Sequence, residues 1–177
     1  MTKKRERAFA WVGIIIFTIS ALALTTAVII QQLMSNSNSA TTASTASCTD
    51  SSVEPVLPTP TVYLPNGSVT SLQITDLTTG SGQAAKSGNC LVVKYYGTIA
   101  SSGKEFDQDF DQPIGFAFTL GQGQVISGWD QGLVGLKVDG TRRLVIPSSL
   151  AYGSQANGSI PANSALVFVV KLLRIQS

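Results

Sequence analysis

Histidine is absent from this sequence of 177 residues, and cysteine occurs only twice, as Cys48 and Cys90. Without histidine the chain lacks the usual base of a Ser–His or Cys–His nucleophilic pair and the commonest protein ligand of metal ions. Charged residues make up only 12% of the chain and the formal net charge is +2, so no basic face favours nucleic acid. We therefore expect a site with no metal and no cofactor, and no nucleic-acid partner.

The few charges are distributed unevenly along the chain. Lysines and arginines crowd residues 1–8, and no charged residue follows until Asp50. Within this gap, residues 9–33 form an almost unbroken apolar run, and about 20 such residues suffice to cross a bilayer as a helix. A cleaved signal peptide has a shorter apolar region of about 7–15 residues. We predict an uncleaved signal-anchor transmembrane helix at residues 9–33, with a cleaved signal and a buried helix as alternatives.

Charge bias and composition also predict the domain organisation. Basic residues before a span favour the cytoplasmic side, which makes residues 1–8 a cytoplasmic tail and places the rest of the chain outside the cell membrane. Residues 34–66 are rich in Ser, Thr and Pro and contain few large apolar groups to offset the entropy of ordering. We predict a flexible linker there and a folded, extracytoplasmic domain at residues 67–177.

The two cysteines lie near the end of this linker and the start of the domain. Export would allow Cys48 and Cys90 to form a disulfide, whose loop closure would stabilise the fold by about 4 kcal/mol. Two free thiols are the simplest alternative. A lipid-modified Cys48 is a third, although the residues before it lack the expected leucine and lie far from the apolar run.

The pattern of apolar residues becomes strand-like from residue 69 onward. It does so at residues 72–74, 91–96, 116–120, 144–146 and 166–173. One segment differs, because Ile126, Trp129, Leu133 and Leu136 recur at helical spacing, and glycines among them predict a helix of only one or two turns. The sequence thus predicts an α+β fold in which a curled antiparallel sheet of about five strands wraps around one short helix.

The same region supplies aromatic and aliphatic side chains from several separated segments. They could line a dry pocket that binds an apolar group and removes its water, with no nucleophile or metal ligand among them. The candidates are Tyr95, Phe106, Phe116, Val125, Ile126, Trp129, Tyr152, Ile160 and Phe168. Such a pocket suits a reaction that depends on desolvation rather than on covalent chemistry.

Four strings in this region resemble the FKBP-type peptidyl-prolyl cis–trans isomerases, in particular their membrane-anchored bacterial members. They are VVKYYG at residues 92–97, GKEFD at 103–107, the string from FTLGQGQVISGW to AYG at 118–153, and IPANSALVFVVKLL at 160–173. The resemblance covers residues 72–175. It implies an FKBP-like fold and a rotamase activity that interconverts the cis and trans forms of X–Pro bonds.

The resemblance also implies roles for individual residues. Asp107 would accept a hydrogen bond from the Tyr95 hydroxyl near the twisting carbonyl, and the Tyr152 hydroxyl would donate to a substrate carbonyl, which makes these three residues catalytic. Trp129 would form the floor under the proline ring, and the Ile126 backbone N–H would contact a second carbonyl. The implied substrate-binding set is Phe106, Phe116, Val125, Ile126, Trp129, Ile160 and Phe168.

The partners implied are proline-containing unfolded or newly exported polypeptides, and rapamycin-like macrocycles, which resemble a twisted prolyl amide. The membrane would be a further partner, through the N-terminal helix. The same pocket could instead act as a chaperone or docking module with little turnover, or the fold could belong to a structural surface protein. Asp107, Tyr152 and Trp129 argue against the structural protein, which would not need them together.

Several positions qualify the resemblance. Gln112 stands where many family members have an arginine, so Asp107 would lack that counter-charge. Residues 157–159 form a shorter and more polar rim than usual, and Gln124 replaces a common glutamate. Adjacent side chains of a strand point to opposite faces, so at most one of Arg142 and Arg143 can approach Asp107. Phe116 and Phe118 lie two residues apart in a predicted strand, and we expect at least one of them, Phe118, to be a core residue.

Overall fold

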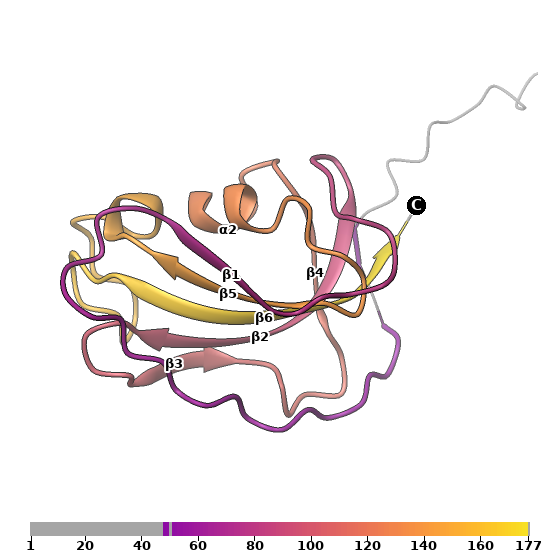
Figure 1. Ribbon diagram of the computed structural model, residues 1–177, viewed down its shortest axis with the longest axis horizontal. Helices are drawn as coiled ribbons and strands as arrows, with labels where there is room; N and C mark the ends of the chain where they lie inside the picture. Colours follow the sequence, from indigo (N-terminus) through magenta and orange to yellow (C-terminus); the bar gives the residue numbers. More distant parts are fainter. Residues whose placement is uncertain (1–47, 50, 177) are drawn as a thin grey trace, which may run out of the picture. The chain divides into compact units, whose positions relative to one another are not determined.

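The computed structural model describes residues 48–49 and 51–176, and the predicted span at residues 9–33 lies outside them. One antiparallel sheet has the strand order β1-β5-β6-β2-β3, and β4 also pairs with β2 (Figure 1). The strands are β1 (Gln73–Thr78), β2 (Cys90–Ile99), β3 (Glu105–Gln108), β4 (Phe116–Thr119), β5 (Thr141–Ile146) and β6 (Leu166–Gln176). A short helix, α2 (Ser127–Gly132), and a 3-10 turn, η1 (Ser148–Leu150), lie between the strands. No helix in this described part of the chain is both long and apolar enough to cross a membrane.

The sheet has six strands rather than about five, because two short strands share one edge of β2. β4 pairs with residues 90–93 at the start of β2, and β3 pairs with residues 96–98 near its end. The strand that the sequence did not predict is β3. Its four residues include one large apolar side chain, Phe106, and therefore show no apolar alternation. The curled antiparallel sheet with one short helix is as predicted for the described residues.

The core of the domain lies between the sheet and α2 (Figure 1). The helix approaches β5 closely, since a Cβ atom on Gly128 would lie only 2.4 Å from Cγ2 of Ile146. Glycine at this position lets the following residue, Trp129, reach the core, where it is 4% exposed. The glycines that shorten the helix therefore also set its distance from the sheet.

The two arginines of β5 point to opposite faces, as alternation predicts. Arg142 pairs with Asp76 of β1 at 2.6 Å, and it donates to the carbonyl oxygen of Gly132 at the end of α2 at 2.8 Å. Arg143 lies on the other face, with its guanidinium 3.6 Å from the ring centroid of Tyr63. Arg142 thus fastens the helix and the edge strand to the sheet.

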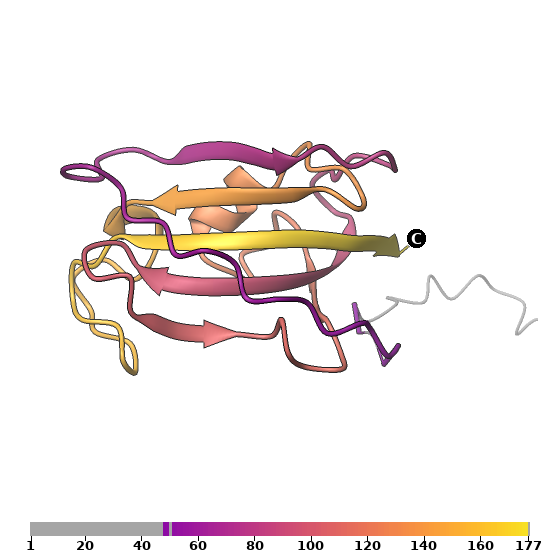
Figure 2. The same ribbon diagram turned by 60° about the horizontal axis from the view of Figure 1, so that its bottom comes forward.

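The segment before β1, residues 51–66, crosses the face of the sheet opposite α2 (Figure 2); we call it the strap. Leu57 of the strap packs on a cluster of buried side chains that includes Tyr96 and Phe110. Further along, Tyr63 packs on a second cluster around Val145. The strap therefore covers apolar side chains that would otherwise face solvent on this side of the sheet.

The strap differs from the flexible linker that the sequence predicted for residues 34–66. It is extended, a conformation that its prolines favour, but it lies against the domain. The backbone N–H groups of Glu54 and Leu57 donate to the carbonyl oxygens of Pro113 and Phe110, at 2.6 and 2.8 Å. Burial of its few apolar side chains, together with these hydrogen bonds, offsets the entropy of ordering the segment.

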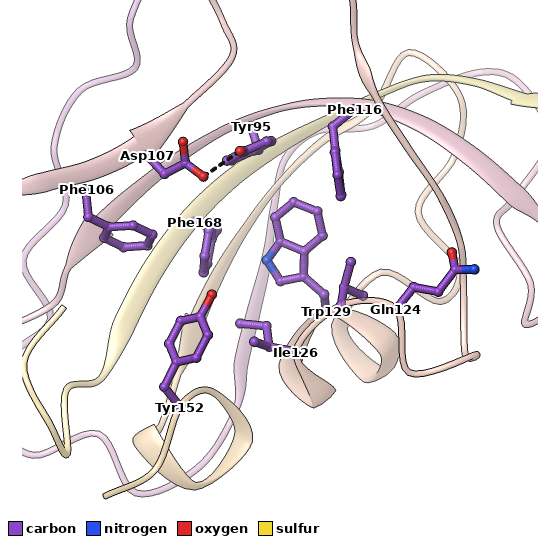
Figure 3. Close-up of a pocket in the computed structure, with 10 residues that line it drawn as sticks. Tyr95, Phe106, Asp107, Phe116, Gln124, Ile126, Trp129, Tyr152 and Phe168 are labelled. Atoms are coloured by element: carbon purple, nitrogen blue, oxygen red, sulfur yellow. Dashed lines mark hydrogen bonds between the residues drawn. The ribbon is translucent and has the colours of Figure 1, made fainter. Parts of the chain in front are cut away.

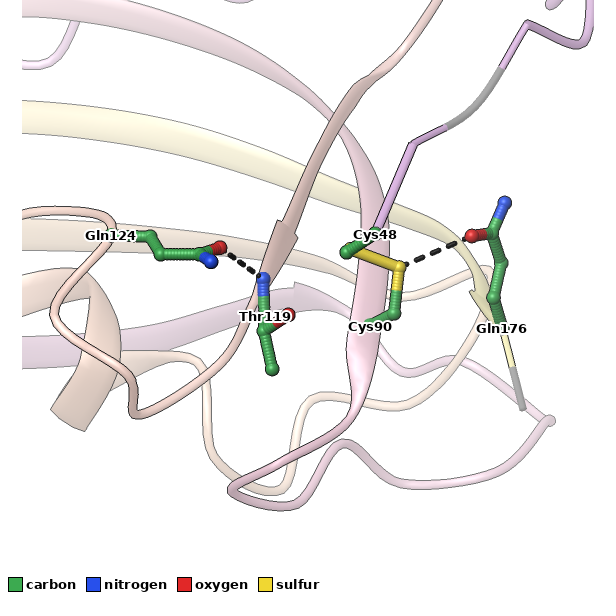
Figure 4. Close-up of a disulfide and its surroundings, with 5 residues drawn as sticks. All are labelled: Cys48, Cys90, Thr119, Gln124 and Gln176. Carbon is green, nitrogen blue, oxygen red and sulfur yellow. Dashed lines mark hydrogen bonds between the residues drawn. A yellow bond between two sulfur atoms is a disulfide. The ribbon is translucent and has the colours of Figure 1, made fainter. Parts of the chain in front are cut away.

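A disulfide joins Cys48 to Cys90, the first residue of β2, with their Cα atoms 5.4 Å apart (Figure 4). The side-chain oxygen of Gln176 lies 3.1 Å from the Cys90 sulfur. Glu54 of the strap pairs with Arg174 of β6 nearby. The sequence left three states open for the two cysteines, and the structure has the disulfide. This bond ties the chain just before the strap to the sheet.

Candidate active site

A cavity of about 180 Å³ opens beside α2 (Figure 3). It is lined by Tyr95, Phe106, Asp107, Phe116, Gln124, Val125, Ile126, Trp129, Tyr152 and Phe168. These residues come from strands β2, β3, β4 and β6, from α2 and the loop before it, and from the turn after η1. Pockets for drug-sized ligands measure roughly 300–1,000 Å³, so this cavity has room for only one part of a larger ligand, such as a single ring.

The Trp129 indole lines the cavity and lies among other aromatic rings of the lining (Figure 3). Its ring centroid is 5.2 Å from that of Phe168, 5.4 Å from Tyr95 and 6.2 Å from Phe116, and each pair is edge to face. Such contacts favour one orientation of the rings. The indole Nε1 is buried and has no hydrogen-bond partner in the described part of the chain. The site therefore has a well-supported apolar floor.

Two walls of the cavity depend on a glycine in β2. A Cβ atom on Gly97 would lie 2.8 Å from the Phe106 ring and 2.9 Å from the Phe168 ring. These two rings contact each other edge to face, with centroids 5.5 Å apart. Any side chain at Gly97 would displace them, which explains physically why the VVKYYG string ends in glycine.

Tyr95 and Asp107 form a hydrogen-bonded pair at the rim. The Tyr95 hydroxyl donates to Oδ2 of Asp107 at 2.6 Å, and the Gln108 N–H donates to Oδ1 at 3.0 Å. Burial, and then the hydrogen bond to Asp107, raise the pKa of the Tyr95 phenol well above its usual range. The phenol therefore stays protonated near neutral pH and acts as a hydrogen-bond donor to the carboxylate. The Tyr152 hydroxyl points into the cavity from another side (Figure 3).

Asp107 has no ion-pair partner in the described part of the chain, where the ion pairs are Arg142 with Asp76 and Arg174 with Glu54. Gln112, at the position of the family arginine, donates instead to Oδ1 of Asp111 at 2.8 Å. Among residues 48–49 and 51–176, the donors to this carboxylate are therefore two neutral groups, a phenol and a backbone amide.

The structure brings every predicted site residue to this cavity except Ile160. Ile160 is buried in the core and lines an adjoining depression together with Asn157, Gly158 and Ser159. Gln124 lines the cavity although sequence reasoning treated it only as a departure from the family. Its side-chain oxygen accepts a hydrogen bond from the Thr119 N–H at 2.8 Å, which holds the loop before α2 against β4.

Phe116 and Phe118 share one face of β4, because side chains two residues apart in a strand point the same way; Phe118 is the core residue, as expected. Phe118 is 2% exposed and belongs to the core, whereas Phe116 is 40% exposed and forms part of the rim. Their rings stack with centroids 5.6 Å apart. The core residue therefore supports the wall residue from behind.

Comparison with known proteins assigns this chain to a family. The model of the FKBP-type peptidyl-prolyl cis-trans isomerases matches residues 81–173. The chain belongs to this FKBP family. An FK506-binding protein of Streptomyces anulatus is 42% identical over 119 residues, which are 66% of this chain and 96% of that protein. The crystal structure of FkpA from Escherichia coli is 41% identical, with a TM-score of 0.55 over 60% of this chain and 49% of that chain.

The FKBP relatives match only part of this chain, and the longer relatives match only over part of their own length. FK506-binding protein 4 of Gibberella zeae is 46% identical over 108 residues, which are 61% of this chain but only 21% of that longer protein. The FKBP family model begins after β1. The strap and Cys48 lie outside the residues that the family model matches.

Proposed function

We propose that this protein is a peptidyl-prolyl cis–trans isomerase that works by desolvation, without a covalent intermediate. The observation that carries the proposal is the apolar cavity floored by Trp129, with the Tyr95–Asp107 pair at its rim. Its size suits a proline ring, and its lining offers no activated nucleophile. Membership of the FKBP family supports the same activity.

The chemistry of the X–Pro bond explains why such a cavity would be catalytic. Rotation about the bond has a barrier of about 18–20 kcal/mol, because resonance gives the C–N bond partial double-bond character. The twisted amide has lost this resonance, so its carbonyl oxygen carries less negative charge. It therefore loses less hydration energy than the planar amide when water is removed. A dry cavity therefore favours the twisted form over the planar one. Each ~1.4 kcal/mol of that preference increases the rate tenfold.

In this mechanism the lining residues have different roles. Trp129 would support the proline ring, while Phe106, Phe116, Val125, Ile126 and Phe168 exclude water from it. The Tyr152 hydroxyl and the Ile126 backbone N–H would donate to carbonyl groups of the peptide and fix its direction. Asp107, held by Tyr95, would face the twisting carbonyl, whose carbon becomes more electron-poor as resonance is lost.

We further propose that the enzyme acts outside the cytoplasm, tethered by residues 9–33, on proline-containing polypeptides that are unfolded or newly exported. The basic residues before this apolar run support the orientation. The Cys48–Cys90 disulfide supports an oxidising compartment. Macrocycles of the FK506 and rapamycin type, which resemble a twisted prolyl amide, would compete for the cavity.

The test is the rate of cis–trans exchange in a short proline peptide, measured by NMR or a protease-coupled assay with the purified full-length chain. We expect acceleration that a macrocycle of this type abolishes. Binding of the macrocycle without acceleration would support the alternative, a chaperone or docking module. The observation that favours this alternative is that Asp107 has no basic partner among the described residues. If the chain neither accelerates exchange nor binds the macrocycle, the proposal is overturned.

A further inference from the structure

Lys94, in the middle of β2, is completely buried, which is rare for a lysine unless its charge has partners. Its ammonium donates to backbone carbonyl oxygens of the loop between β3 and β4. These belong to Asp109 at 2.9 Å, Ile114 at 3.4 Å and Gln112. The chain thus wraps a short loop around one buried cation.

The carboxylate of Asp109 is also buried, and it joins two walls of the cavity. One oxygen, Oδ1, accepts the backbone N–H of Tyr95 at 2.5 Å, and Oδ2 accepts the backbone N–H of Phe116 at 3.1 Å. In return, the Asp109 N–H donates to the Tyr95 carbonyl oxygen at 3.0 Å. A single side chain therefore sets the backbone positions of two residues that line the cavity.

Sheet pairing explains why the backbone of Tyr95 needs a side chain as its hydrogen-bond partner. β4 pairs with β2 up to Val93, and β3 pairs with β2 from Tyr96 onward. Tyr95 therefore lies in a gap between the two short strands, where neither supplies the next partner along this edge. The Asp109 carboxylate fills the gap and takes the place of the missing strand.

We propose that Asp109 is a positioning residue of the prolyl site, with Lys94 as its buried counter-charge. Asp109 holds the backbone of Tyr95 and Phe116 at the separation that the cavity requires. Asp109 touches no substrate in this role and acts only through these two residues. The inference rests on the proposed isomerase function, because the prolyl site is the feature that is positioned.

The chemistry of the carboxylate makes the role specific. An ionised aspartate accepts with both oxygens, whereas asparagine has one acceptor oxygen and a donating NH₂ group. In Asp109→Asn one of the two backbone N–H groups must face a donor and lose its partner, and a buried donor without a partner is costly. Tyr95 or Phe116 would then move away from the cavity, although the side chain keeps its shape.

Protonation of Asp109 should have the same effect as this substitution. Burial raises the pKa of the carboxyl, although the Tyr95 N–H, the Lys94 charge and the Phe116 N–H oppose the increase and Asp107 adds to it. A folded-state pKa above the usual value of 3.8 means that acid converts one acceptor oxygen of Asp109 to a donor at a pH above that usual value. The groups that face Asp109 are Lys94 and Tyr95 on β2 and Asp107 on β3.

The experiment compares full-length wild type, Asp109→Asn and Asp111→Asn. Asp111 is an exposed aspartate two residues away that bonds to the side chains of Gln108 and Gln112, so it is a matched control for the loss of one charge. We expect kcat/KM to fall about tenfold in Asp109→Asn and to remain unchanged in Asp111→Asn. The backbone amides of Tyr95 and Phe116 should also exchange with solvent faster in Asp109→Asn alone.

A second measurement uses the unmodified chain and covers the case in which Asp109→Asn does not fold. On acidification, the amide resonances of Tyr95 and Phe116 should titrate together, with a midpoint above the ordinary aspartate value, while the chain stays folded. Lys94→Met should reduce the protection of the same two amides from exchange with solvent. Its effect should not add to that of Asp109→Asn, because the two residues share one network.

The outcomes separate this inference from the proposed function. If wild type does not accelerate isomerisation, the proposed function fails, but amide exchange and titration still test the positioning. If wild type is active and folded Asp109→Asn has unchanged kcat/KM and unchanged Tyr95 and Phe116 amides, the positioning role is overturned. A wild-type pH profile in which these amides do not titrate together would overturn it as well.

Discussion

The Tyr95 hydroxyl lies 2.6 Å from Oδ2 of Asp107 and joins β2 to β3 across the rim of the cavity. Because burial raises the phenol pKa, the pair is a neutral donor and a carboxylate acceptor rather than a proton-transfer couple. The two halves of the pair can therefore be altered separately, which distinguishes the charge of Asp107 from its hydrogen bond.

The first prediction concerns that charge. Asp107→Asn keeps the shape and can still accept from Tyr95, so we expect normal folding and a decrease in kcat/KM of about three- to tenfold, equivalent to ~1 kcal/mol. Tyr95→Phe keeps the charge but removes the hydrogen bond. Peptide isomerisation kinetics measure both. Equal activity of Asp107→Asn and wild type would show that the charge contributes nothing.

The second prediction concerns the hydroxyl of Tyr152. Tyr152→Phe should lower kcat/KM severalfold and weaken macrocycle binding, because the ring remains but the donor to a ligand carbonyl is lost. Tyr63→Phe is the matched control, since Tyr63 belongs to the strap on the other face of the sheet. Activity and calorimetric binding should change only in the first variant; an equal change in both would exclude a specific role for Tyr152.

The third prediction concerns the disulfide. Reduction should lower the free energy of unfolding by about 4 kcal/mol if loop closure in the unfolded chain dominates. Thermal unfolding with and without reductant measures this, and a Cys48→Ser/Cys90→Ser variant should not respond to reductant. Mass mapping of unreduced peptides checks the bond itself. Two alkylatable cysteines in protein isolated from membranes would exclude it.

The fourth prediction concerns topology. With residues 9–33 as an anchor and residues 1–8 inside, protease added to intact cells should remove the domain and leave a small protected fragment. A tag placed at each end, followed by immunoblotting, distinguishes the two ends of the chain. Full protection of the domain would contradict this orientation.

The fifth prediction concerns acid stability. The hydrogen bond from Arg142 lowers the pKa of Asp76 from 3.8, so the folded state binds a proton less readily than the unfolded one. The stabilisation is complete above the unfolded value and is lost as pH falls through the lowered folded value. The difference in Tm between wild type and Asp76→Asn should be constant near neutral pH and shrink below about pH 4. Because Asp76 is half exposed, the difference should be small; a difference that grows in acid would contradict the assignment.

Sequence reasoning found the cavity because its residues occur in strings whose spacing is set by strand alternation and one helical turn. Trp129, with Leu133 and Leu136 at helical spacing, already indicated the helix under the site. β3 could not be found in the same way, because it is held by pairing with β2 rather than by its own apolar pattern.

The network around Asp109 was missed for a different reason. A lysine in a strand ordinarily predicts a solvent-facing position, and the partners of Lys94 are backbone carbonyl groups, which have no signature in sequence. The strap was assigned to the linker because composition measures how little apolar surface a segment has. It does not measure whether the sheet offers apolar surface for Leu57 and Tyr63 to cover.

The disulfide also determines how a mechanical load would travel through the protein. Tension on the chain before Cys48 passes through the covalent bond to Cys90 and thus directly into β2, which is paired on both sides by other strands. Residues 49–89, including the strap and β1, lie outside this covalent path. If residues 9–33 anchor the chain as proposed, a pull from the anchor would reach β2 through the disulfide while the strap stays on the sheet.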